Sequence, residues 1–238
     1  MNMRHVWLVA LCSLAAFGIN AADEGSLKGS VKLVGDIPEM KPHDVPVKDQ
    51  AGCNCKQIEN EELIVDKATK GIKDAIIRIM DVKGPDLPAG QKVPEVDQKG
   101  CKFTPHITIV APGSELVALN PDKLSHNIHT TPLDLENQQM NVIMIEEKKT
   151  IKAKYFEKPE IIQLQCDLHP WMKGYIVVHD PRYVAVSAAD GTFEIKGVPP
   201  GKYKVNVFQG NQGAQDGIDV EIKAGQATDM GEIKFGKK

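Results

Sequence analysis

The chain lacks the features of a membrane-embedded, nucleic-acid-binding or disordered protein. Aromatic residues make up only 5% of its 238 residues, and we find no internal repeat, low-complexity tract or amphipathic helix. Charge is nearly balanced, with 29 Lys and Arg against 32 Asp and Glu, so there is no basic footprint for nucleic acid. Beyond residue 21 no apolar run approaches the ~20 residues that a membrane-spanning helix needs. We therefore expect no nucleic-acid partner and no transmembrane segment in the mature protein.

The first 21 residues have the pattern of a secretory signal peptide. Arg4 precedes an apolar run from Val6 to Ile19, and small residues follow up to Ala21. The run is too short for a membrane anchor. The sequence thus predicts cleavage after Ala21 and a periplasmic or secreted protein.

Cysteine is scarce as well, with five in the chain and one of them, Cys12, inside the predicted signal peptide. Export permits disulfides. Cys53 and Cys55 are a poor pair, because closing a Cys-x-Cys ring strains disulfide geometry. We expect Cys101 to bond either Cys53 or Cys55, and the spacing does not decide which. A second metal site, built from these three cysteines and a histidine such as His43, also stays open.

Short strands and turns dominate the rest of the sequence. The 15 prolines and 20 glycines break it into brief segments, which favours strands over long helices. Residues 25–34 alternate small or apolar with polar residues, and residues 72–80 are rich in β-branched side chains, so both ranges are predicted strands. From Cys101 onward, strand-like runs follow one another at the spacing of a Greek-key sandwich or barrel. The predicted fold class is all-β.

One stretch carries most of the chemistry, and it reads Cys166-Asp167-Leu168-His169-Pro170-Trp171-Met172. It joins two strand-like runs, at 161–165 and 174–178, so its thiolate, imidazole and thioether share a tight loop. These donors suit copper, whose electron-transfer sites use two His and one Cys in a trigonal plane with a weak axial Met.

The second imidazole must come from elsewhere, and the segment from Ser125 to His129 provides candidates. His126 and His129 are an odd number of residues apart, so they face opposite sides of a strand and cannot easily share one metal. We choose His126. Asn127 is expected to bridge the two ligand segments by hydrogen bonds.

Both motifs resemble those of cupredoxins, above all the amicyanins, whose ligand loop has the same short Cys-x2-His-x2-Met spacing and whose His-Asn-x-His segment begins with a copper ligand. The resemblance covers about residues 99–180. It implies a Greek-key cupredoxin sandwich and a single type 1 copper ion, held by His126, Cys166, His169 and an axial Met172.

The flanking sequences resemble a different kind of module. Residues 189–193 and 198–203 are similar to turns of carboxypeptidase-regulatory-like, immunoglobulin-like β-sandwiches, and Gly29, Val31 and residues 73–77 to that module's opening strands. The resemblance implies a signal peptide (1–21), an N-terminal β segment (22–98), a cupredoxin domain (99–182) and a C-terminal β-sandwich segment (183–238). In that arrangement the cupredoxin is inserted into a split sandwich, as in exported methylamine-utilisation or plastocyanin-like proteins.

The function expected from these motifs is one-electron transfer with a redox partner protein. His169 is expected to lie nearest the surface, with Pro170 and Trp171 as an apolar rim for a small, transient contact. Catalysis is not expected, because four protein ligands leave no open metal position. Two alternatives stay open, a copper chaperone or store and an interaction module without redox function. In the plainest alternative, Cys166 is a buried thiol or half of a disulfide and His169 a surface histidine.

Overall fold

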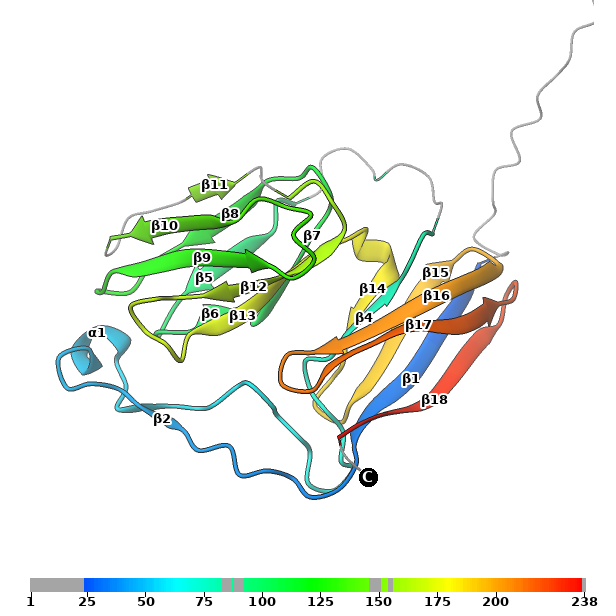
Figure 1. The fold of residues 1–238 in the computed structure, drawn as a ribbon, viewed down its shortest axis with the longest axis horizontal. Coiled ribbons are helices and arrows are strands. Elements are labelled where there is room, and N and C mark those ends of the chain that lie inside the picture. The colour runs from blue at the N-terminus through cyan, green and yellow to red at the C-terminus, as the bar shows by residue number, and fades with distance from the viewer. Residues whose placement is uncertain (1–23, 83–86, 88–91, 146–150, 154–155, 237–238) are drawn as a thin grey trace, which may run out of the picture.

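The structure is a computed structural model that describes residues 24–82, 87, 92–145, 151–153 and 156–236. The predicted signal peptide lies outside the described residues. Within them the fold is all-β apart from two short helical turns, and no helix is both long and apolar enough to cross a bilayer. Figure 1 shows two layered β units side by side, which we call the flank sandwich and the central sandwich.

The flank sandwich is built from strands at both ends of the chain. One of its sheets has the order β15-β1-β18 and the other the order β14-β4-β16-β17. β1 pairs antiparallel with β15 and parallel with β18, so the blue and red strands of Figure 1 lie together. Its strands are β1 (Gly25–Leu33), β4 (Ile76–Ile79), β14 (Val184–Val186), β15 (Thr192–Val198), β16 (Gly201–Gln209), β17 (Gly213–Ile222) and β18 (Ala227–Phe235).

The central sandwich is formed by the part of the chain that lies between β4 and β14 in the sequence. Its five-stranded sheet has the order β10-β9-β12-β13-β7, and its four-stranded sheet the order β11-β8-β5-β6. The strands are β5 (Glu95–Gln98), β6 (Phe103–Thr104), β7 (Ile107–Val110), β8 (Leu116–Leu119), β9 (His126–Pro132), β10 (Met140–Met144), β11 (Ile151–Ala153), β12 (Glu160–Gln165) and β13 (Lys173–Val178).

Two structural details differ from the sequence expectations. The predicted strand at 72–80 is shorter, because Asp74 adopts a positive φ of 60° and only Ile76–Ile79 form β4. β5 lies N-terminal to the boundary expected at residue 99, yet it pairs with β8 and β6 inside the central sandwich. Its sequence Glu-Val-Asp-Gln has little strand propensity, so tertiary pairing decides its conformation.

Each sandwich has its own apolar core, and a third cluster joins them. Phe156, Ile128 and Leu164 are fully buried in the central sandwich, and Leu27 and Ile77 in the flank sandwich. The joining cluster comprises the buried side chains Ile76, Ile107, Ile161, Val177 and Val184, and the η2 turn (Pro181–Tyr183) connects the two units.

One further segment leaves the flank sandwich and returns to it. It contains β2 (His43–Asp44), α1 (Gln50–Cys53) and β3 (Gln57–Ile58), and in Figure 1 it extends below the central sandwich, with α1 near one end of it. The β2–β3 pair forms a small sheet of its own. The segment thereby reaches the end of the central sandwich at which the predicted ligand loop lies.

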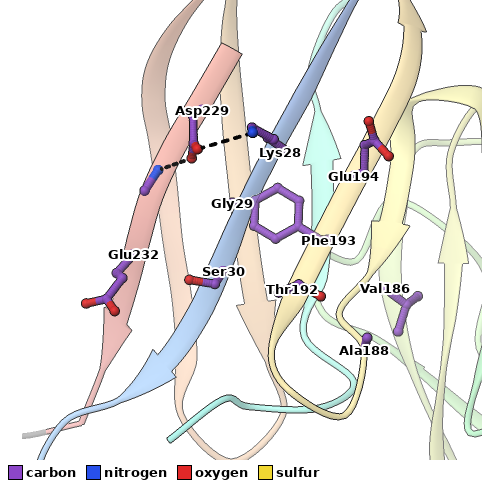
Figure 2. A pocket seen from close by; sticks show the side chains of 11 residues that line it. Lys28, Gly29, Ser30, Val186, Ala188, Thr192, Phe193, Glu194, Asp229 and Glu232 are labelled. Atoms are coloured by element: carbon purple, nitrogen blue, oxygen red, sulfur yellow. Dashed lines mark hydrogen bonds and ion pairs between the residues drawn. The ribbon is translucent and has the colours of Figure 1, made fainter. Parts of the chain in front are cut away.

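The flank sandwich also has a wide surface hollow of about 750 Å³ over β1, β15 and β18. Figure 2 shows the Phe193 ring beside Gly29 and the ion pair between Lys28 and Asp229, whose atoms are 3.7 Å apart. The hollow has a charged rim and no cysteine or histidine among its lining residues. We assign it no function.

Candidate metal centre

The predicted ligand residues lie at one end of the central sandwich because three neighbouring strands begin or end there. His126 is the first residue of β9, Cys166 follows the last residue of β12, and β13 begins directly after Met172. β12 pairs with both β9 and β13, with Gln165 opposite His129. The sheet therefore brings together two segments that are forty residues apart in the sequence.

Three of the four predicted ligands converge on one point. His126 Nδ1 lies 2.9 Å from His169 Nδ1, and Cys166 Sγ lies 3.9 Å from His126 Nδ1 and 3.7 Å from His169 Nδ1. Metal bonds of about 2.0–2.1 Å to nitrogen and about 2.3 Å to sulfur, the lengths known for zinc, place ligand atoms roughly 3–4 Å apart. The three side chains thus fit a shared metal ion. All are buried, at 0%, 2% and 4% exposure for His126, Cys166 and His169.

Met172 is part of the same loop and is buried at 1% exposure. The loop is closed by two backbone hydrogen bonds, from Met172 N to His169 O (2.8 Å) and from Cys166 N to Met172 O (3.1 Å). Met172 packs in the same apolar core as Cys166. The loop's backbone bonds thus bring Met172 back beside Cys166 and His169.

Asn127 bridges the two ligand segments, as predicted. Its backbone N–H points to Cys166 Sγ at 3.4 Å, and its side-chain oxygen accepts a hydrogen bond from Asp167 N at 2.6 Å. Its side-chain amide donates to an Asp167 carboxylate oxygen at 2.9 Å. These bonds fix the start of the loop against β9.

Asp122 is a residue of this site that the sequence did not reveal. Its Oδ2 lies 3.1 Å from His126 Nε2, and backbone N–H groups hold the carboxylate in place, Gly100 N at 2.8 Å from Oδ1 and Cys101 N at 2.8 Å from Oδ2. A carboxylate on the far ring nitrogen fixes the tautomer of a metal-binding histidine and raises its basicity. Asp122 therefore leaves the Nδ1 lone pair of His126 free for a metal.

The site's hydrogen bonds also favour a thiolate. Burial alone would raise the pKa of the Cys166 thiol, but hydrogen bonds with His126, His169 and the backbone N–H of Asn127 outweigh it and lower the pKa to about 6. Burial would likewise lower the pKa of His126, but its hydrogen bonds to Asp122 and Cys166 raise it overall. A thiolate is the form of cysteine that binds metals.

His129 lies on the other side of β9, as expected from its spacing to His126. It is partly exposed, and its Nδ1 lies 2.9 Å from Asp167 Oδ1. Its hydrogen bond is the largest of several that hold the pKa of Asp167 well below its usual range. His129 therefore supports the carboxylate next to Cys166, and its ring is not grouped with the ligand atoms of His126, Cys166 and His169.

His169 is the most exposed of the four predicted ligands, but at 4% exposure it does not offer the accessible docking point that was expected. Its side chain is only 5% exposed, its Nε2 is 3.9 Å from Asp49 Oδ2 at the start of α1, and Trp171 packs 5.3 Å from it between ring centres. Trp171 is partly buried against the central core and its indole N–H donates to Cys101 O at 3.2 Å, so it does not form a freely exposed rim. No local sequence pattern connects Asp49 to a loop more than a hundred residues later.

The disulfide joins Cys53 to Cys101, one of the two pairings left open by the sequence, and leaves Cys55 as a half-buried free thiol. Ligand-type atoms of Cys101, Asp122 and His126 also lie within 4.8 Å of one another. Because Cys101 is in the disulfide, it has no thiolate to offer there. His43 lies in β2, and the structure groups neither it nor His106 with other metal-ligand side chains among the described residues.

Comparison with known proteins gives structural matches only. No protein-family profile matches the chain, and no curated protein matches its sequence. Among solved structures, it is similar to amicyanin from Paracoccus versutus (19% identity, 43% of this chain and 97% of that one, TM-score 0.32). A novel purple cupredoxin from Nitrosopumilus maritimus matches at 18% identity over 35% of this chain and 97% of its own, with a TM-score of 0.29.

A copper-containing nitrite reductase from Thermus scotoductus matches at 20% identity over 42% of this chain, with a TM-score of 0.33, and the match spans only 25% of the reductase. These similarities are low and cover less than half of the chain. A metal function for this chain therefore depends on the geometry of the site itself.

Proposed function

We propose that the protein binds one copper ion and transfers single electrons, and that His126, Cys166 and His169 would hold the ion with Met172 as a weaker fourth ligand. The observation that carries this proposal is the buried triangle of two imidazole nitrogens and one sulfur, 2.9–3.9 Å apart, at the end of a rigid sheet. Two His, one Cys and a weak Met form the ligand set of blue-copper electron-transfer sites. When bound, copper would supply a reversible one-electron couple.

The protein's own residues would keep the site nearly unchanged as the electron arrives and leaves. Asp122 holds the His126 ring, and Asn127 holds the loop at Cys166. The core around Met172 is closed to solvent. A site that needs little rearrangement between oxidation states suits rapid electron exchange.

The covered His169 changes where a redox partner would approach. A surface hollow of about 250 Å³ reaches Cys166 and is lined by Gln165, Cys166, Asp167, Pro170 and Lys173. Leu168, beside it on the same loop, is 49% exposed. We expect a partner to exchange electrons through this thiolate side of the loop.

One observation favours a second function, copper storage or delivery. A ligand set as buried as this one, with α1 against His169, is well suited to retain metal. A carrier that hands over electrons and a protein that hands over copper would use the same ligands in different ways.

Voltammetry of the copper-loaded protein separates the two functions. Electron transfer predicts a reversible one-electron wave and copper that stays bound through many cycles. Loss of copper on reduction, with transfer to a Cu(I) chelator, would support the storage function and contradict the first proposal.

A further inference from the structure

Residues 43–58 form a closed loop with its own internal bonds. His43 pairs with Ile58 and Asp44 with Gln57, so the two ends of the loop lie side by side. Inside it, Val45 N donates to Lys56 O at 2.9 Å, and the Gln50 side chain donates to Val45 O at 2.9 Å. A compact loop whose ends lie close together is of the Ω type, and such loops are frequently functional.

This loop lies directly over the His169 side of the candidate metal centre. Asp49 Oδ2 is 3.9 Å from His169 Nε2. One turn later the backbone of Gly52 lies so close to Leu124 that an added Cβ would be 2.2 Å from its Cγ. This loop, which precedes the His169 sheet in the sequence, thus contributes to the low exposure of His169, which is 4%.

One covalent bond and a small set of buried side chains hold the loop against the central sandwich. Val45, Cys53 and Ile58 are its buried side chains in the central core, whereas Val47 is 84% exposed. Cys53 is joined to Cys101 by the disulfide. The backbone N–H of Cys101 donates to Asp122, whose carboxylate lies 3.1 Å from His126 Nε2, so the disulfide is anchored next to the candidate metal centre.

We propose that residues 43–58 are a lid over the metal centre, latched by the Cys53–Cys101 disulfide, and that lifting this lid limits how fast metal enters and leaves. The metal in this inference depends on the proposed copper function. The lid itself is a property of the metal-free chain and can be tested without copper.

The first test measures access to His169 in the metal-free protein. Diethyl pyrocarbonate modifies accessible imidazoles, and peptide mass spectrometry reports the rate at each histidine. The unlatched variant is Cys53→Ser with Cys55→Ser, because the free Cys55 thiol would otherwise take over the bond to Cys101. Cys55→Ser alone keeps the latch and is the matched control.

Modification of His169 should be roughly tenfold faster or more in the unlatched variant, since a disulfide strongly restricts local opening. His43, on the loop itself, should react at the same rate in both proteins. If His169 is modified at the same rate in the unlatched variant and the control, the lid proposal is wrong.

Gly52→Val provides a test that leaves every cysteine in place. Its side chain would meet Leu124 and push the loop outward, so His169 should become reactive while the disulfide stays intact. If the cysteine variant fails to fold, this variant decides the question, and unchanged protection of His169 would contradict the proposal.

The second test uses copper-loaded protein and a competing chelator. Copper should leave the unlatched variant roughly tenfold faster or more than the Cys55→Ser control, because release requires the same opening. If His169 becomes reactive but no variant binds copper, the copper function fails and the lid stands. If copper binds but leaves both proteins at one rate, the lid does not control the metal.

Discussion

The substitution Asp122→Asn changes the carboxylate that connects the backbone at Gly100 and Cys101 to the predicted ligand His126. The carboxylate accepts three hydrogen bonds, from Gly100 N, Cys101 N and His126 Nε2. An asparagine has only one oxygen, which is best placed at the Oδ2 position, where two donors converge. The backbone N–H of Gly100 would then face an amide group that cannot accept its hydrogen bond.

The magnitude is set by these bonds. A buried donor left without a partner costs about 1–3 kcal/mol, so the free energy of unfolding of the metal-free protein should fall by about that amount. The bond to His126 would survive but lose its charge, and such changes behind a metal-binding histidine typically weaken metal binding about 10–100-fold. Asp122→Ala, which removes all three bonds, should weaken copper binding further.

Competition with a copper chelator measures the affinity, and chemical denaturation measures the stability. Asp180→Asn is a suitable control. The partly buried Asp180 carboxylate also accepts hydrogen bonds, from the backbone and side chain of Arg182, and it follows β13 at the end of that strand away from the ligand loop. It should lower stability and leave copper affinity unchanged. If Asp122→Asn loses stability but binds copper as tightly as the parent, Asp122 does not orient His126.

The remaining predictions concern the metal ligands and one distant histidine. Cys166→Ala should abolish the colour of the copper protein, whereas Cys55→Ala should retain it, and a colourless Cys55→Ala would point to a different thiolate. Met172→Leu should keep copper and shift the reduction potential measured by voltammetry, because the axial ligand tunes it. In metal-free protein the thiolate absorbance of Cys166, with Cys166→Ser subtracted, should titrate at about pH 6 and not near 9. Burial holds the pKa of His179 low, so the unfolded chain takes up a proton first as pH falls below about 6.5. Stability should therefore drop below that pH, and His179→Gln should flatten the drop in denaturation curves taken between neutral and acidic pH.

The local parts of the site were predictable from the sequence. Cys166, His169 and Met172 lie within one tight loop, so their spacing alone brings them near one another, and the strand period separates His126 from His129. Strands with strong β-branched patterns, such as β12 and β13, are also found where the sequence predicts them.

The long-range parts were not predictable in the same way. Asp122 acts through the backbone N–H groups of Gly100 and Cys101, and no residue pattern encodes which carboxylate those groups will hold. The cover over His169 comes from Asp49 and α1, which are more than a hundred residues away in the sequence and meet the site only through the tertiary fold. β5 becomes a strand because β8 pairs with it, and not because of its own side chains.

The central claim is a copper ion bound by a buried thiolate and two imidazoles. Visible absorption and electron paramagnetic resonance spectra of the mature protein after Cu(II) addition test it most directly. Such a site predicts an intense thiolate-to-copper band together with a narrow copper hyperfine splitting. A folded protein that binds Cu(II) without that band, or binds no copper at all, would contradict it.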